Sequence, residues 1–316
     1  MKKQILLVAT ILLLINFSKA AILRCNNNPL SVGPNVYTNA QQAHDAASAG
    51  DTIHLEPHGS YGTLTLSKPL VIISTGYFLT LNSGLQANPL EATLDNINCN
   101  PGSENSIISC NVSNNIYVQA NDITLKNTRA LYVYIQASPV YNLSIKQSVV
   151  TYLCGSGCGG NGWNNLILEN SYIDNIFNNS PASSSAIINQ CIVNFFSFSV
   201  ENSVITNSIF FANTVFDNCN AHNNICGGFM VGNFTGTNNI PLVDMTNVLA
   251  QWPTFQGDDY QLVPSYSNQT IGMYAGSNPY KPGGIPAIPT IYQLDIPENT
   301  SNMNNLQIQV STKSNN

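Results

Sequence analysis

Charged side chains are scarce in this sequence. They make up 8% of its 316 residues, about a third of the share that is typical of soluble proteins. The ten Lys and Arg residues are dispersed, whereas a nucleic-acid site needs basic residues clustered against phosphates. The Asp and Glu residues are dispersed as well, and a calcium site usually needs several carboxylates together. The composition therefore argues against a nucleic-acid partner, and we predict no cofactor.

Long apolar runs are absent after the first twenty residues. Residues 1–20 combine a basic start, an apolar run over residues 4–17 and small residues at Ser18 and Ala20. This is the layout of a secretory signal peptide cleaved after Ala20, with an uncleaved anchor as the alternative. Cleavage would remove three lysines and change the formal charge from −6 to −9. We expect a secreted or cell-surface protein with no transmembrane segment after cleavage.

Asparagine is abundant, with 46 copies, while apolar residues still account for 43% of the chain. The apolar share is too high for a disordered polymer. Asparagine tolerates left-handed backbone conformations and suits sharp turns, and stacked copies can pair through their amides. This combination is typical of a solenoid whose turns carry asparagine.

A weak repeat runs through the middle of the chain. Alternating segments recur with anchors at Lys126, Lys146, Glu169 and Asn189, which are 20, 23 and 20 residues apart. That period fits one coil of a β-helix. Shorter echoes, which we assign to half periods, follow at residues 201–205, 212–216 and 223–225.

The first coil is predicted from three short β-rich runs at residues 52–55, 62–66 and 70–73. Residues 40–49 form a helix candidate that would cover the open end of the stack. A β-sandwich is the rival fold, because it also has many short strands. We predict an all-β, right-handed parallel β-helix with a short N-terminal capping helix and a C-terminal tail outside the repeat.

The predicted domain boundaries follow from these patterns. After the signal peptide, residues 21–39 are a lead-in and residues 40–280 the β-helix domain. Residues 281–316 are a proline-rich link followed by a strand pair at residues 290–296 and 306–312, which either caps the solenoid or reaches away from it.

Cysteine usage indicates disulfides. Eight cysteines follow the predicted cleavage site, an even number in an exported chain. Spacing suggests three pairs: Cys99–Cys110, Cys154–Cys158 and Cys219–Cys226. Sequence alone leaves the connectivity open, and Cys191 also fits a free thiol buried in a solenoid core.

Two stretches carry a family resemblance. Residues 40–73 (with AGDTIHLEPHGSYGTLTLSKPLVIIS) resemble the opening coil of parallel β-helix proteins of the pectin-lyase-like superfamily, and residues 257–294 resemble the end of uncharacterised exported β-helix proteins of Bacteroidetes. The resemblance implies a solenoid and, in many members, cleavage of acidic polysaccharides. The aspartate pair Asp258-Asp259 matches one hydrolase element, but the partner motifs Asn-Thr-Asp and Gly-His-Gly are missing.

Other catalytic and metal candidates are sparse. A lyase would need a base, and Lys126, Lys146 or Arg129 could supply it. A metal site could use His54, Glu56 and His58, although Pro57 interrupts their strand. We therefore keep a polysaccharide lyase or hydrolase as the alternative function only.

Aromatic residues in the middle coils offer a binding surface. Tyr132 and Tyr134 share one face by alternation, and Trp163 lies nearby in the repeat. Aromatic rings stack on sugar rings, although the same residues could instead fill the core or stack on one another. We predict a non-catalytic protein that binds a glycan or cell-surface polymer through Tyr132, Tyr134 and Trp163.

Overall fold

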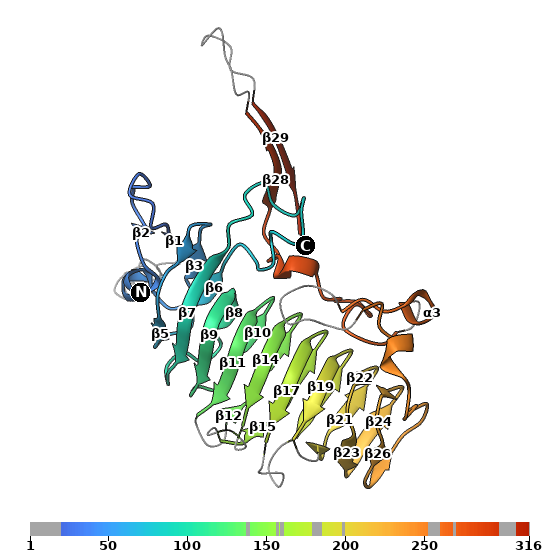
Figure 1. The fold of residues 1–316 in the computed structure, drawn as a ribbon. Coiled ribbons are helices and arrows are strands. Elements are labelled where there is room, and N and C mark those ends of the chain that lie inside the picture. The colour runs from blue at the N-terminus through green and yellow to red at the C-terminus, as the bar shows by residue number, and fades with distance from the viewer. Residues whose placement is uncertain are drawn as a thin grey trace, which may run out of the picture.

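The chain forms a parallel β-solenoid of about eight turns (Figure 1). The computed structural model describes residues 20–136, 140–155, 158, 161–178, 185–197, 200–251, 260–267, 270–296 and 308–315. The predicted signal peptide, except Ala20, lies outside these residues, as does the Asp258-Asp259 pair. The parallel pairing of successive coils confirms the solenoid over the β-sandwich.

Two long parallel sheets form the main walls. Within the described residues, sheet A has twelve strands in the order β2 (Val36–Tyr37), β1 (Ile22–Cys25), β3 (Thr52–Leu55), β6 (Val71–Ile73), β8 (Ile107–Ser109), β10 (Thr124–Lys126), β13 (Ser144–Lys146), β16 (Leu166–Glu169), β18 (Ala186–Asn189), β21 (Val204–Thr206), β24 (Cys219–His222) and β27 (Phe234–Thr235). Sheet B, likewise counted, has ten strands: β25 (Ile225–Cys226), β22 (Ile209–Phe210), β19 (Ile192–Phe196), β17 (Tyr172–Phe177), β14 (Val149–Cys154), β11 (Arg129–Ile135), β9 (Asn111–Val118), β7 (Ala92–Cys99) and β4 (Gly59–Ser60), with β5 (Leu64–Leu66) also paired to β7.

Smaller sheets complete the coils. Strand β12 (Val140–Tyr141) pairs with β15 (Trp163–Asn164), and β23 (Thr214–Asp217) lies between β20 (Val200–Glu201) and β26 (Met230–Val231).

The observed register confirms the predicted repeat. Lys126 pairs with Lys146, Lys146 with Glu169, and Glu169 with Asn189, so the anchors occupy one row of sheet A. The next partners are Thr206 and His222, 17 and 16 residues further on (206 − 189 and 222 − 206). The segment at residues 201–205 therefore follows the preceding anchor segment by one full coil and not by half a coil, because the later coils are shorter.

Asparagine marks the corners of the coils, as predicted. Two rows of left-handed residues flank the strands of sheet A, and most of them are Asn or Gln with φ near +50°. One row contains Asn142, Asn165, Asn202 and Asn218, and the other contains Asn127, Gln147, Asn170, Gln190, Asn207 and Asn223. Neighbouring amides pair across coils, as in Asn165 Nδ2 to Asn142 Oδ1 at 2.6 Å. Since few side chains tolerate this conformation, asparagine determines where each coil turns.

The interior holds a polar ladder beside the aliphatic core. At the corner that enters sheet B, successive coils place Thr128, Ser148, Ser171, Cys191, Ser208 and Asn224, all buried. The Thr128 and Ser148 amides donate to the hydroxyls of Ser148 and Ser171 at 3.0 and 3.1 Å. We call these six residues the inner ladder. It satisfies backbone groups that would otherwise be buried without a partner.

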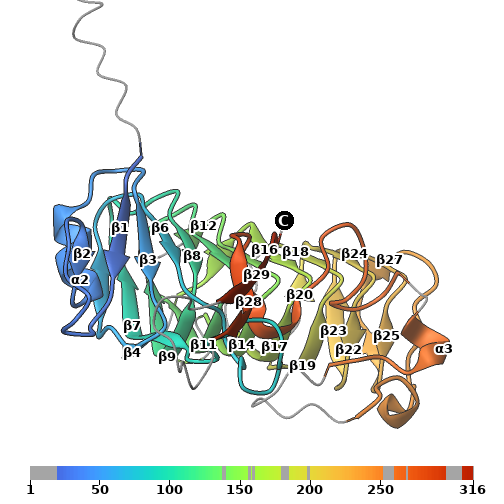
Figure 2. The same ribbon diagram turned by 90° about the horizontal axis from the view of Figure 1, so that it is seen from above.

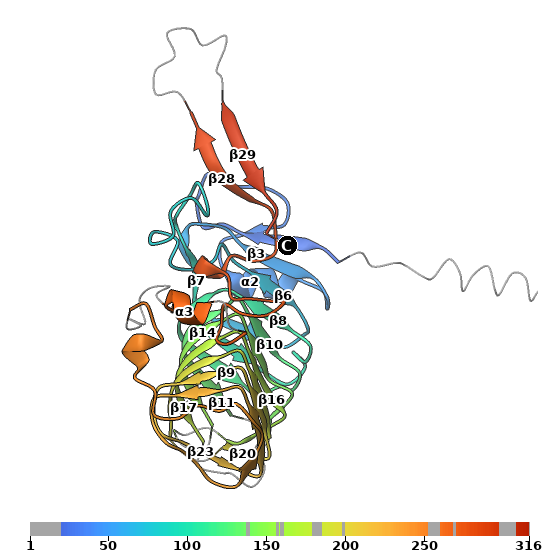
Figure 3. The same ribbon diagram turned by 90° about the vertical axis from the view of Figure 1, so that its right-hand side faces the viewer.

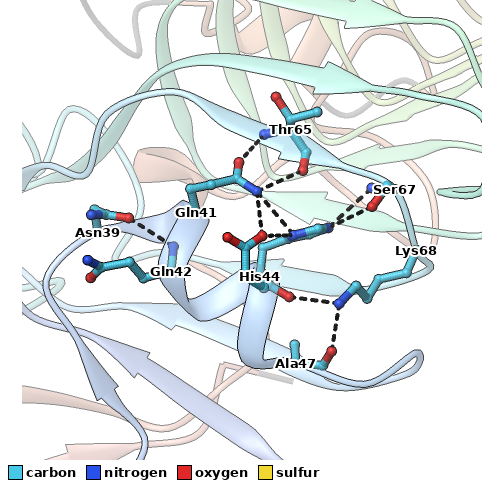
Figure 4. A network of polar contacts seen from close by, with 9 residues as sticks. Asn39, Gln41, Gln42, His44, Ala47, Thr65, Ser67 and Lys68 are labelled. Atoms are coloured by element: carbon cyan, nitrogen blue, oxygen red, sulfur yellow. Dashed lines mark hydrogen bonds and ion pairs between the residues drawn. The ribbon is translucent and has the colours of Figure 1, made fainter.

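Helix α2 (Ala40–Ala46) covers the N-terminal end of the stack, which confirms the predicted cap (Figure 4). Gln41 accepts a hydrogen bond from the Thr65 amide at 2.8 Å, and His44 accepts one from the Ser67 amide at 3.2 Å. Lys68 donates to the carbonyls of His44 and Ala47 at 3.0 and 2.8 Å. Side chains of the helix thus pair with an edge that would otherwise be open to another strand.

The C-terminal tail runs back along one side of the solenoid. It contacts the coils in reverse order: Gly272 donates to the Asn207 carbonyl at 2.9 Å, the Pro279 carbonyl accepts from Gln147 at 2.6 Å, and the Gly283 carbonyl accepts from Tyr77 at 2.8 Å. Ile271, Met273 and Tyr280 of the tail pack on outward residues of sheet B such as Ile192 and Ile209. The tail therefore covers a second apolar cluster outside the coils.

The tail ends in an antiparallel hairpin that points away from the stack (Figures 1 and 3). Strand β28 (Thr290–Asp295) pairs with β29 (Gln309–Lys313), close to the predicted strand pair. Viewed from above, the hairpin lies over the solenoid and not beyond either end (Figure 2). Of the two predicted arrangements, the hairpin reaches away and does not cap the stack.

The cysteine predictions are right for one pair and wrong for two. Cys154 and Cys158 form a disulfide, whereas Cys99, Cys110, Cys219 and Cys226 are free, buried thiols. Cys99 lies opposite Val118, at the far end of β9 from Cys110. The Cys219 and Cys226 thiols instead donate to the carbonyls of Val200 and Ala212, at 3.1 and 3.0 Å. Cys191 is also free and buried, as its alternative assignment predicted.

Candidate functional site

Six aromatic side chains on the outer face of sheet B contact one another in a continuous line that alternates between two neighbouring register rows. Successive ring centroids lie 5.4 Å apart for Tyr117–Tyr134, 5.3 Å for Tyr134–Tyr132, 4.6 Å for Tyr132–Tyr152, 6.2 Å for Tyr152–Phe177 and 6.4 Å for Phe177–Phe195. We call this line the aromatic strip. It extends over the coils of β9, β11, β14, β17 and β19 and includes the predicted residues Tyr132 and Tyr134.

Strand register builds the strip from two parallel rows. In one row Tyr132 pairs with Tyr152, Tyr152 with Asn175, and Asn175 with Phe195. The other row passes from Tyr117 to Tyr134, Cys154 and Phe177. Because side chains two residues apart share a face, both rows point outward.

The rings of the strip stack largely on one another. Planes from Tyr117 to Phe177 deviate by only 10–18° between neighbours, so offset neighbours cover much of each ring face. Phe195 is tilted by 58° from Phe177 and is 40% exposed. The prediction of flat sugar-stacking faces at Tyr132 and Tyr134 therefore needs revision: stacked neighbours cover much of these two rings, and Phe195 is the most exposed ring of the strip.

Trp163 does not belong to this surface. Its side chain is 5% exposed and belongs to the main core. Trp163 starts β15, in a different small sheet from the strip, and it packs beside Gly155, where an added Cβ would lie 2.9 Å from the indole. The prediction that Trp163 forms part of the binding surface is wrong, because its strand turns the ring inward.

Amide side chains continue the strip toward the N-terminal coils. Asn115, in the same row as Tyr132, donates to Asn96 Oδ1 and to the Tyr117 hydroxyl, both at 3.1 Å. Asn98, in the row of Tyr117, donates to the Thr65 hydroxyl at 3.3 Å. Burial, together with the nearby Tyr132 and Tyr117, raises the pKa of the Tyr134 hydroxyl. The strip and its extension thus carry hydroxyl and amide groups that can donate and accept hydrogen bonds.

The carboxylate beside the strip is enclosed. Asp174 is 5% exposed and accepts hydrogen bonds from Asn175 and Asn194, both at 2.6 Å. Burial raises the pKa of this carboxyl, although these hydrogen bonds and one from Tyr172 partly offset the effect. Within the described residues, no ion pair joins Asp174 to a Lys or Arg.

The charged residues considered for catalysis lie apart from the strip. Lys126 and Lys146 lie on sheet A, where Lys146 forms an ion pair with Glu169 at 2.8 Å. Arg129 lies over the Phe78 ring at 4.9 Å from its centroid. Lys126 and Lys146 are thus neighbours on sheet A, whereas Arg129 lies on sheet B.

Glu56, one of the three residues considered for a metal site, is engaged in other contacts. Glu56 forms an ion pair with Arg24 and accepts from Asn26 Nδ2 at 2.6 Å. Burial is the main effect on His54, and it lowers the pKa of that imidazole despite the nearby Glu56. Among the residues that the structure describes, no three His, Cys, Asp or Glu side chains gather in a metal-binding group.

Two of the hollows formed by the described residues lie away from the strip. A shallow groove of about 490 Å³ lies over the last coils and is lined by amides, including Asn202, Asn218 and Asn233. A cleft of about 380 Å³ is lined by His54 and by Ile291 and Leu294 of hairpin strand β28. Neither of these two hollows has a Phe, Tyr or Trp side chain among its described lining residues.

Phe177 and Phe195 were not among the binding residues predicted from the sequence. The signal was present in the repeat, because Tyr132, Tyr152, Asn175 and Phe195 each follow their anchor by six residues. Extending the anchor pattern by six positions would have identified this outward row.

Comparisons with protein-family models, curated proteins and solved structures give no match to this chain. In the described part of the chain, no helix has both the length and the hydrophobicity needed to cross a lipid bilayer.

Proposed function

We propose that this protein is a non-catalytic glycan-binding protein, secreted or held at the cell surface, and that the aromatic strip is its binding surface. The proposal rests on the alignment of tyrosine and asparagine side chains with the partly exposed Phe195 ring along five coils. Sugars offer hydroxyls to the polar groups and C–H faces to the ring.

The signal-peptide pattern of residues 1–20 supports export, and so does the resemblance to exported β-helix proteins of the pectin-lyase-like superfamily. A low share of charged residues suits a protein that recognises an uncharged surface.

The polysaccharide lyase or hydrolase remains the alternative, but the described residues give it little support. Such chemistry needs carboxylates and a base together in an accessible groove. Asp174 is enclosed by amides, and the lysines lie on the other sheet.

The test uses the purified, secreted chain on a glycan array and on insoluble polysaccharides. We expect binding that falls in the double variant Tyr132→Ala/Tyr152→Ala and that persists in Ile187→Ala, a matched control on the outer face of sheet A. Thermal unfolding of each variant verifies folding. Absence of binding to any glycan would refute the proposal, and release of reducing ends or unsaturated products would favour the enzyme instead.

A further inference from the structure

The geometry of the strip indicates one class of ligand. Building on the proposed function, we infer that the strip binds a neutral, extended, β-linked polysaccharide that runs parallel to the solenoid axis, with about one sugar for each coil.

The direction follows from the rows. The register carries the row Asn96, Asn115, Tyr132, Tyr152, Asn175 and Phe195 across six successive strands, from β7 to β19. Adjacent strands are about 4.8 Å apart. An extended chain of β-linked pyranose rings advances by nearly this length for each sugar. A ligand along the axis therefore meets a side chain at the equivalent position of each coil. A ligand that crosses the strip meets only the two rows.

The charge of the ligand follows from the composition of the two rows. Every residue in them is Asn, Tyr, Phe or Cys, so none carries a charge near pH 7. Two carboxylates lie beside them: Asp174 is buried and bonded to Asn175 and Asn194, and the half-buried Asp95, next to Asn96, accepts a hydrogen bond from the Ser60 hydroxyl at 2.7 Å. An acidic polymer would gain no counter-charge here and would approach a negative chain, of net charge −6 with residues 1–20 and −9 after the predicted cleavage. A neutral polymer meets no such repulsion.

The two ends of the strip differ. Amides dominate at Asn96 and Asn115, whereas Phe195 offers the exposed ring at the opposite end. We therefore assign the main stacking contact to the sugar over Phe195, and hydrogen bonds to the sugars over the preceding coils.

The experiment measures the affinity of the secreted chain for neutral β-linked oligosaccharides of increasing length, and for acidic polymers at two salt concentrations. We expect affinity to rise with each added sugar up to about six units, the length that the strand spacing allows, and then to level off. Neutral ligands should bind with little salt dependence. Phe195→Ala should lower the affinity for the longest ligand about tenfold, which corresponds to about 1.4 kcal/mol, whereas Ile187→Ala should not.

Three outcomes would overturn the inference while glycan binding itself stood. These are a plateau at two or three sugars, a preference for acidic polymers that weakens with salt, and unchanged affinity in Phe195→Ala. Binding to no glycan at all would instead remove the proposed function.

Discussion

The solenoid contains two ladders that run across the same coils but have different chemistry. The inner ladder of Thr128, Ser148, Ser171, Cys191, Ser208 and Asn224 is buried, and its side chains bond to backbone groups of neighbouring coils. The aromatic strip lies outside, and its members contact mainly one another. Polar residues repeated inside the coils therefore stabilise the fold, whereas residues repeated on the outer face leave groups available for a ligand.

The largest expected change in the free energy of unfolding comes from the buried thiols at alkaline pH. Burial raises the pKa of the Cys99 and Cys191 thiols to about 12, from an ordinary value of 9.0. Below about pH 9 both folded and unfolded chains keep these protons, so the stabilisation is complete. As the pH rises further, the unfolded chain loses its protons first, and stability falls progressively until the folded thiols ionise near pH 12.

Denaturant unfolding at pH 7, 9, 10 and 11 measures this loss. The variant Cys191→Ser should flatten the pH dependence, because it removes one titrating thiol. A free energy of unfolding that stays constant from pH 7 to 11 would contradict the burial of these thiols.

A smaller loss of stability is expected when the corner residue Asn170, which connects the coils to the tail, is substituted. Asn170 has φ +47°, and its amide donates to the carbonyls of Met273 and Ala275 at 3.1 and 2.7 Å. Asn170→Ala should lower the free energy of unfolding by about 3–4 kcal/mol, from about 1–2 kcal/mol of left-handed strain and roughly 1 kcal/mol for each of the two hydrogen bonds. Asn170→Gly is the matched variant, and it should recover the backbone part. Equal melting temperatures for the two variants would show that the left-handed corner is unimportant.

Two cysteine variants compare positions inside the coils. Cys99 packs in the apolar core, so Cys99→Ser should cost about 1–3 kcal/mol because it buries a hydroxyl among apolar groups. Cys191 occupies the inner ladder, where Ser171 and Ser208 hold the equivalent positions and its thiol already approaches the Asn189 carbonyl at 3.4 Å. Cys191→Ser should cost less than about 1 kcal/mol. Chemical denaturation at pH 7 measures both, and the reverse order would refute the ladder assignment.

The smallest effect on stability is expected on the strip. Tyr132→Phe keeps the stacking with Tyr134 and Tyr152, at 5.3 and 4.6 Å, and removes only a hydroxyl. We expect a change within about 0.5 kcal/mol, as for other surface positions, together with weaker glycan binding. A stability loss as large as that of Cys99→Ser would mean that the strip serves folding in the same way as the interior.

Much of the fold was predictable because its signals are local. The anchors from Lys126 to Asn189 recur at the coil period, and asparagine occupies the left-handed corners between strands. The capping helix and the C-terminal strand pair were also recognised from short segments. Such features depend on backbone preferences of a few neighbouring residues.

The candidate site was predicted only in part. Tyr132 and Tyr134 were placed on one outer face correctly, because alternation along a single strand is a local property. Trp163 and two cysteine pairs were misassigned and Phe195 was not identified, since their exposure and partners depend on which neighbouring coil lies beside them.

The coil period and the corners can be read from the sequence alone, because apolar alternation and asparagine act within a few residues of the chain. Which outward row remains accessible depends instead on how distant segments pack. The described part of the tail covers the row of Tyr172, Ile192 and Ile209 after returning from the last coil, and the half-buried aromatic strip lies outside the cluster that it covers. That choice depends on contacts between segments as distant as Asn170 and Ala275, and no local pattern encodes them.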